Sequence, residues 1–197
     1  MDEFDEPEKK IRKPRPLKEV TPKRIRGQAL RYLDRFATTT PKLARHLYNK
    51  NRKAIEFFEL DEHSVMQIIE TEIEKLVSAG IMDDQQYADS KARTMARQGK
   101  SKRQIVGKLI TFGLEDSHTD HAITELEEVQ GHTDELGAAK YIKKRRFGPY
   151  KDPETQVDRH QKELLTLVRN GFDFSLGERL LKFESIENIE DIIYGKQ

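Results

Sequence analysis

Apolar positions along the chain recur at helical spacing. Three alanine-led segments begin at Ala29, Ala88 and Ala138, a spacing that leaves room for about three short helices per unit. Residues four apart lie on one face of an α-helix, so an apolar pair at that spacing indicates a buried stripe. The order of alanine segment and apolar pair repeats, which predicts stacked helical modules. The three pairs are Leu43/Leu47, Ile105/Leu109 and Leu164/Val168.

Capping residues place the helices of the first unit. The first helix is expected from about Pro22 to Ala37, with Phe36 on its buried face. Residues 38–41, Thr-Thr-Thr-Pro, end it and start the second helix, because threonine accepts from free N–H groups and proline suits the first helical turn. A long third helix begins near residue 61, capped by Asp61 or Ser64.

The later units end their middle helices in the same way. Gly113-Leu114 and Gly171-Phe172 each combine a glycine, which adopts the left-handed turn, with an apolar residue that folds back. The first unit has Asn51-Arg52-Lys53 in place of this ending. Gly80 ends the third helix, and Asp83 or Asp84 is expected to cap the helix that follows. No alternating apolar pattern persists, so the predicted fold class is all-α: tandem three-helix repeats stacked into an elongated, curved solenoid.

Composition agrees with a thin, highly solvated molecule. Apolar residues make up 35% of the 197 and charged residues 36%, whereas globular domains have roughly 45–50% and 25%. Proline and charge dominate the start of the chain, which predicts a flexible tail. The expected organisation is a tail over 1–24, repeats over 25–80 and 81–131, and a third repeat with a C-terminal tail over 132–197.

The chain has the sequence features of a cytoplasmic protein. It contains no cysteine, no apolar run near the roughly 20 residues that span a bilayer, and no basic-then-apolar leader at its start. The net charge of +1 argues against a uniformly basic coat. The charges are sorted instead, since Lys91 to Lys108 carries no acid and Glu115 to Glu135 no Lys or Arg, a pattern typical of directional contacts.

Candidate catalytic and metal chemistry is weak. His118 and His121 lie one turn apart, but a zinc site needs a third ordered ligand. The simpler interpretation is that both are surface histidines in an acidic segment. Gly99-Lys100-Ser101 resembles the end of a phosphate loop but lacks its earlier glycine. We therefore expect no catalytic residue, no metal and no other cofactor.

Basic residues recur in all three units and are the candidate binding residues. Exposed lysines and arginines commonly just solvate a helix. Stacked repeats would instead align them into a stripe that follows a phosphate backbone or an acidic protein groove. The candidates are Arg31, Arg35, Arg45, Arg93, Arg97, Lys100, Lys102, Arg103, Lys108, Lys143, Lys144, Arg145 and Arg146.

Three segments resemble the RecX family of bacterial regulatory proteins. Residues 80–88, Gly-Ile-Met-Asp-Asp-Gln-Gln-Tyr-Ala, are similar to its Gly-apolar-apolar-Asp-Asp-x-x-aromatic-Ala signature. Residues 103–114 resemble its basic helix ending in Gly-apolar, and residues 164–174 its last repeat. The likeness covers roughly residues 25–183, and the order in which the three segments follow one another is characteristic of the family.

The resemblance implies a function. Members of this family modulate the RecA recombinase, lying along the groove of the RecA–DNA filament and limiting its growth, ATP turnover and strand exchange. We therefore expect a monomer that binds the RecA filament, with single- or double-stranded DNA as a further ligand and no membrane contact. The alternative is a stand-alone helical nucleic-acid-binding protein such as a transcription regulator, which the same basic stripe would serve.

Overall fold

The chain folds into α-helices joined by short connections. The computed structural model describes residues 16–195, and for 153–158 it describes the backbone alone. No strand occurs in this part of the chain, and the predicted all-α fold class is confirmed. The helices are α1 (Pro22–Leu33), α2 (Thr40–Phe57), α3 (Glu62–Ser78), α4 (Asp84–Arg97), α5 (Lys102–Thr111), α6 (Asp116–Glu128), α7 (Asp134–Arg145), the 3₁₀ helix η1 (Gly148–Tyr150), α8 (Pro153–Arg169), α9 (Phe174–Leu181) and α10 (Ile186–Tyr194).

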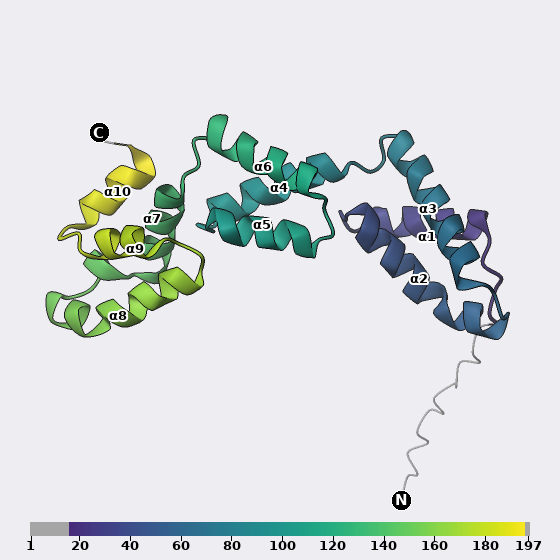
Figure 1. Cartoon of the computed structure of the whole chain (residues 1–197), viewed down its shortest axis with the longest axis horizontal. Helices are drawn as coiled ribbons and strands as arrows, with labels where there is room; N and C mark the ends of the chain where they lie inside the picture. Colours follow the sequence, from purple (N-terminus) through teal and green to yellow (C-terminus); the bar gives the residue numbers. More distant parts are fainter. Residues whose placement is uncertain (1–15, 196–197) are drawn as a thin grey trace, which may run out of the picture.

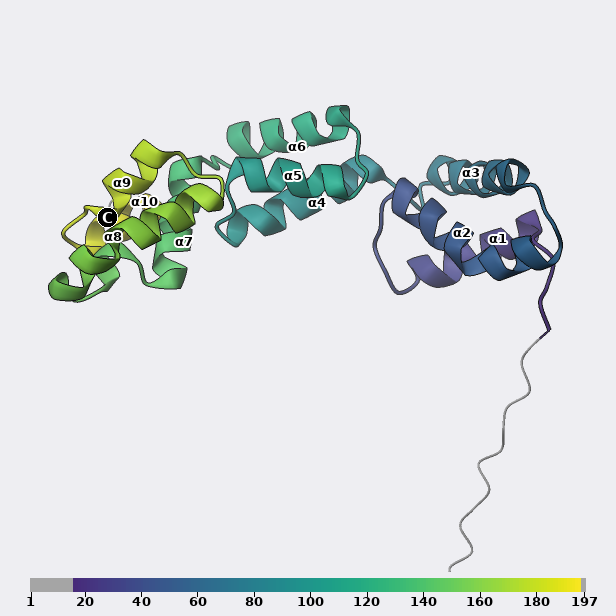
Figure 2. The ribbon, with the colours of Figure 1, turned by 60° about the horizontal axis from the view of Figure 1, so that its bottom comes forward.

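The helices gather into three bodies that follow one another along the long axis (Figure 1). We call them the first repeat (α1–α3), the second repeat (α4–α6) and the third repeat (α7–α10). Each has its own apolar core, and fully buried side chains such as Leu47, Leu109 and Leu167 lie in the three cores. Figure 2 shows the same row from a second direction, in which the bodies again lie end to end. The molecule is therefore elongated, and much of its surface faces solvent.

Carboxylate caps set where several helices begin. The side chain of Asp61 accepts a hydrogen bond from the Ser64 backbone N–H at 2.8 Å, so Asp61 is the cap of α3. Asp83 accepts from the Gln86 backbone N–H at 2.8 Å and caps α4. Such caps satisfy N–H groups that have no partner inside the helix. The sequence left two alternatives for each cap, Asp61 or Ser64 for α3 and Asp83 or Asp84 for α4. In both cases the first residue is the cap.

Successive repeats are joined by equivalent hydroxyl contacts. At the first junction the Thr39 hydroxyl donates to the backbone carbonyl of Phe112 at 2.6 Å. At the second junction the Ser101 hydroxyl donates to the carbonyl of Asn170 at 2.7 Å. In each case the hydroxyl residue precedes the middle helix of one repeat, and the carbonyl ends the middle helix of the next repeat.

Two aspartates complete these junctions. Asp84 accepts from the Thr40 backbone N–H at 3.0 Å and from its hydroxyl at 2.7 Å. Asp134 accepts from the Lys102 backbone N–H at 2.8 Å. Both aspartates are the first residue of their own helix, yet they cap the middle helix of the preceding repeat. The two junctions therefore share one polar plan.

Glycine is required where a middle helix meets the preceding repeat. Gly171 has φ +84°, and a Cβ added there would lie 2.7 Å from the Ser101 Oγ. Gly113 is equivalent, with φ +77° and Pro41 3.0 Å from a Cβ. At the equivalent place in the first repeat, Glu59 stands exposed in the left-handed region with φ 50°, and no other described repeat packs there. Its ending is thus Glu59-Leu60, which corrects the assignment of that place to residues 51–53.

The first helix is shorter than its apolar period predicts. α1 ends at Leu33, and residues 36–39 run without helical structure toward the second repeat. The connection to α2 that follows includes Thr39, whose hydroxyl donates to the Phe112 carbonyl of the second repeat. Phe36, expected on the buried face, is consequently 55% exposed.

Other differences lie in the third repeat and at the ends. Leu164 is buried, but its stripe partner is Leu167, while Val168 is 36% exposed. Residues 186–194, near the end of the expected third repeat with its C-terminal tail, form α10, whose Ile189 is fully buried in the third core. The first fifteen residues of the predicted N-terminal tail lie outside the described residues. Later in that tail, Val20 is buried against the first core.

Candidate functional site

Three of the predicted binding residues are engaged in ion pairs. The Arg93 Nη1 lies 3.2 Å from the Glu125 Oε1, and Lys102 pairs with Glu127. The hydrogen bond to that carboxylate raises the pKa of Lys102. The carboxylates partly neutralise these two cations. We therefore assign Arg93 and Lys102 a smaller role in binding than the sequence predicted for them.

Lys143 is the third paired cation. Its Nζ lies 2.7 Å from the Glu190 Oε1 and 3.1 Å from the Tyr194 hydroxyl, both on α10. Those two hydrogen bonds, Glu190 first, raise the pKa of Lys143. The contact fastens α10 to α7, so the charge of Lys143 serves the packing of the third repeat.

A cluster of cations lies across the first junction. Burial lowers the pKa of Lys42, and the charges of Lys108, Arg45 and Lys91 lower it further. Lys42 and Arg45 are on α2, Lys91 on α4 and Lys108 on α5, so three helices of two repeats contribute. The Lys42 Nζ also lies 3.6 Å from the centroid of the Phe112 ring, within the range of a cation–π contact. The cluster is a concentrated positive charge.

A groove extends this cluster along the second repeat. A hollow of about 540 Å³ between α4 and α5 is lined by Lys91, Lys100 and Lys108. A second hollow of about 490 Å³ is lined by cations of α4 and α7. Gln98 lines both, so the two hollows are neighbours on the surface. We call this surface the basic groove, and its cations are Lys42, Lys91, Arg97, Lys100, Lys108, Lys140 and Lys144.

Among the described residues, the groove cations form no ion pairs. A row of uncompensated positive charge raises the local concentration of anionic partners and speeds their association. The arrangement can therefore hold a polyanion or an acidic protein surface. It contains no evident nucleophile or acid–base pair.

Sequence reasoning identified part of the groove. Arg97, Lys100, Lys108 and Lys144 were predicted and line it. Lys91 and Lys140 lie in basic stretches of the sequence but were not predicted as site residues. Nothing in the sequence around Lys42 predicted its place in the groove, because only the folded junction brings α2 next to α5. The remaining predicted residues lie elsewhere or beside the groove: Arg31, Arg35, Arg45, Arg103, Arg145 and Arg146.

Those remaining cations differ in their surroundings. Arg31 is on α1 and Arg35 follows its end, both exposed. Arg103 lies at the second junction, 3.2 Å from where a Cβ of Gly171 would stand. Arg145 lies over the Tyr141 ring, and Arg146, at the end of α7, has a left-handed φ of 56°. The structure thus does not gather all thirteen predicted residues into a single stripe.

The histidines are dispersed. The His121 Nδ1 lies 2.8 Å from the Gln85 Nε2 and 3.4 Å from the Asp89 Oδ1, whereas His132 is buried in the loop between the second and third repeats. In the part of the chain that the structure describes, no three His, Asp or Glu side chains are grouped so as to hold a metal ion. No helix there has the length and apolar character needed to cross a bilayer.

Comparison with known proteins identifies the family. The chain is 32% identical over 143 residues to the regulatory protein RecX of Agrobacterium fabrum, which covers 72% of the chain and 74% of that relative. It belongs to the RecX family. It is also 29% identical over 175 residues to the regulatory protein RecX of Myxococcus xanthus, covering 88% of the chain and 92% of the relative.

A solved structure supports the RecX assignment. The crystal structure of a regulatory protein RecX matches with a TM-score of 0.55 at 26% identity, over 82% of this chain and 71% of that one. No family model matches the chain. The resemblance inferred from three sequence segments is therefore confirmed by similarity to RecX proteins over most of the chain.

Proposed function

We propose that this RecX-family protein binds along the RecA–DNA filament in the cytoplasm and limits filament growth, ATP hydrolysis and strand exchange. It acts by binding, without catalysing a reaction. The observation that carries the proposal is the basic groove, whose cations lie on α2, α4, α5 and α7. An elongated repeat protein with a long charged face is suited to lie along a polymer.

The groove supports this function by its length as well as its sign. Its cations come from all three repeats, so contact with one short ligand would leave most of them unused. A filament offers repeated acidic and phosphate groups along its surface. A ligand that prefers one state of an assembly shifts the assembly toward that state, and a protein bridging neighbouring subunits has such a preference.

The test compares two ligands under the same salt. Affinity is measured for a bare single strand and for the same strand coated with RecA, and ATP hydrolysis is followed on the coated strand. We expect clearly tighter association with the coated strand and slower ATP hydrolysis. Equal or tighter binding to the bare strand, with unchanged ATP hydrolysis, would instead identify a stand-alone nucleic-acid-binding protein.

A further inference from the structure

The two repeat junctions share one polar plan but differ in how closely the repeats approach. At the second junction a Cβ on Gly99 would lie 3.0 Å from the Tyr141 backbone nitrogen. A Cβ on Gly137 would lie 3.1 Å from the Lys100 carbonyl oxygen. Two glycines therefore let backbone pack against backbone, and this junction is closed.

At the first junction larger residues occupy both glycine positions. Gly99 stands two residues before the cap Ser101, and Ala37 stands two before the equivalent cap Thr39. Gly137 stands four residues after the cap Thr133, and Tyr87 four after Asp83. The same close approach is impossible with a tyrosine at this place. The first junction is consequently held open.

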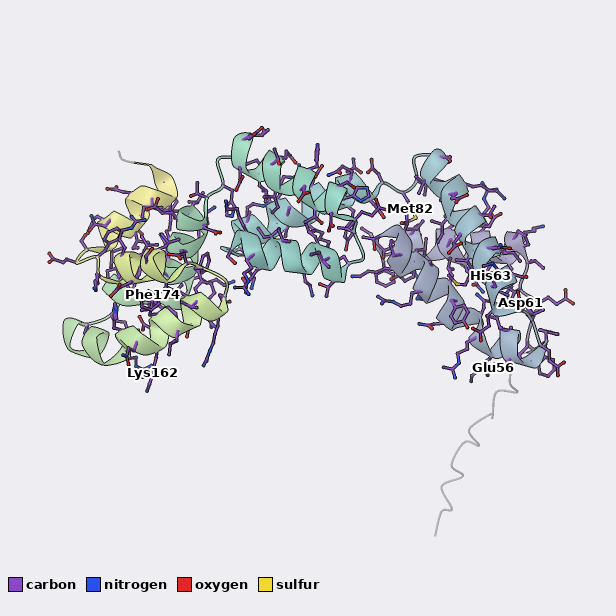
Figure 3. All side chains as sticks on the ribbon, in the orientation of Figure 1. Glu56, Asp61, His63, Met82, Lys162 and Phe174 are labelled. Carbon is purple, nitrogen blue, oxygen red and sulfur yellow. The ribbon has the colours of Figure 1, made fainter. Side chains whose placement is uncertain are left out.

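The open junction is a pocket of about 520 Å³ with an apolar wall. Leu33, Phe36, Ile81, Met82 and Tyr87 line it. Phe36 is 55% exposed and Ile81 is 49% exposed, so large apolar side chains face solvent at one place. Figure 3 shows Met82 at the connection between the first and second repeats. Exposed apolar groups gathered in a concave site are typical of an interaction surface.

Charge around the pocket selects the kind of partner. Lys91 lines both this pocket and the basic groove, so the pocket opens beside the cationic cluster. The nearby Asp83 carboxylate is already engaged as the cap of α4. The Tyr87 ring contacts Phe112 edge-on, with 5.9 Å between the ring centroids. The wall combines apolar side chains with polar ones such as Gln86 and Arg93, a mixed lining that suits an apolar side chain carried on a charged protein segment.

We propose that the pocket receives a large apolar side chain from an acidic segment of RecA. This inference rests on the proposed function and deepens it. The basic groove supplies long-range attraction and register, and the pocket supplies an anchor specific for protein. An apolar anchor in a concave site typically carries a large share of binding energy.

The test uses neutral substitutions, so that electrostatics stay constant. Phe36→Ser and Ile81→Ser, singly and together, remove the exposed apolar wall. Phe57→Ser is the matched control, because Phe57 is 67% exposed at the far end of α2 and does not line the pocket. We expect the double variant to lose about tenfold or more in affinity for RecA-coated single strand, equivalent to about 1.4 kcal/mol. Binding to the bare strand and helical content should stay unchanged.

The outcomes separate this proposal from the proposed function. Wild-type affinity of the double variant for the coated strand would overturn the pocket alone, and so would an equal loss on bare strand. Failure of the unmodified protein to bind the coated strand would overturn the proposed function and the partner named here.

Because the chain has no cysteine, a single reactive site can be placed in the pocket. Ser90→Cys, on the pocket wall, carries a photo-activated cross-linker. We expect cross-links to the RecA protein on coated strand. Cross-links to the DNA strand alone would contradict the proposal.

Discussion

Gly171 is the residue with least room for a side chain at the repeat junctions. Gly171→Ala should cost about 1–2 kcal/mol for the left-handed backbone and about 1–3 kcal/mol more for the clash with Ser101. Gly131→Ala is the matched control, since Gly131 also has a positive φ of 59° but nothing within 4 Å of a Cβ. Urea unfolding measures both. Equal losses would show that the close approach at Gly171 does not contribute to stability.

His132 makes the second junction sensitive to acid. The side chain is 3% exposed and its Nε2 has no hydrogen-bond partner among the described residues. Burial lowers its pKa, the charge of Lys140 lowers it further, and Asp134 opposes them. The unfolded chain therefore takes up the proton first, so the free energy of unfolding falls as pH drops below about 6.5.

The measurement is thermal unfolding of the wild type and of His132→Gln between pH 7.5 and 5.5. We expect the wild type to lose more stability over this range than the variant does, whatever their difference at pH 7.5. His46 is retained in both proteins, and burial also lowers its pKa, so its contribution cancels. Identical pH dependence in the two proteins would contradict the assignment.

At the scale of the elements, the adjacent residues Asp83 and Asp84 show what sequence can and cannot predict. Asp83 caps α4 through a contact three residues away, a local pattern that the sequence displays. Asp84 caps α2, which lies 44 residues earlier in the chain. No spacing rule connects the two, because the contact exists only once the repeats stack. Local caps and stripes could thus be predicted, whereas the junctions could not.

The role of Asp84 can be measured. Asp84→Ala should destabilise the protein by about 1–2 kcal/mol, because it leaves the first N–H of α2 and the Thr40 hydroxyl without their acceptor. Asp120→Ala, at an exposed position on α6, is the control. Urea unfolding that gives the same loss for both variants would show that this cross-repeat cap is dispensable.

The limits of helical periodicity are clearest at α1. The apolar stripe continues to Phe36, but the helix ends at Leu33, and the connection to α2 that follows makes a contact with the second repeat through Thr39. The exposed Phe36 that results became part of a candidate binding pocket. A residue that departs from the local pattern was therefore more informative about function than those that follow it.

For the whole molecule, sequence predicted which residues are basic in each repeat but not which of them share the basic groove. Basic residues recur in every repeat, and that recurrence correctly indicated cations on all three bodies. Which of them share a groove depends on how the repeats stack and on which carboxylates lie opposite. Arg93 and Lys102 face Glu125 and Glu127 of α6, a pairing that becomes visible only in three dimensions.

The basic groove should govern the salt dependence of binding. In the triple variant Lys91→Glu, Lys108→Glu and Lys144→Glu, each lost phosphate contact should reduce the slope of log affinity against log salt by about 0.7 for single strands and about 0.9 for duplex. Exposed charges contribute only about 0–1 kcal/mol each to stability, so the helical content should be retained.

A triple variant of equal net charge serves as the control. It carries Lys23→Glu, Lys53→Glu and Lys162→Glu, exposed positions on α1, α2 and α8, and Lys162 is labelled on α8 in Figure 3. General repulsion affects both variants alike. Only the groove variant should therefore lose most of its affinity and show the regular reduction in the slope of log affinity against log salt. Contacts to an acidic protein surface would lower affinity for the RecA-coated strand without that slope change. If both triple variants bound and slowed ATP hydrolysis equally, the groove cations would only solvate the helices, and the binding face would lie elsewhere.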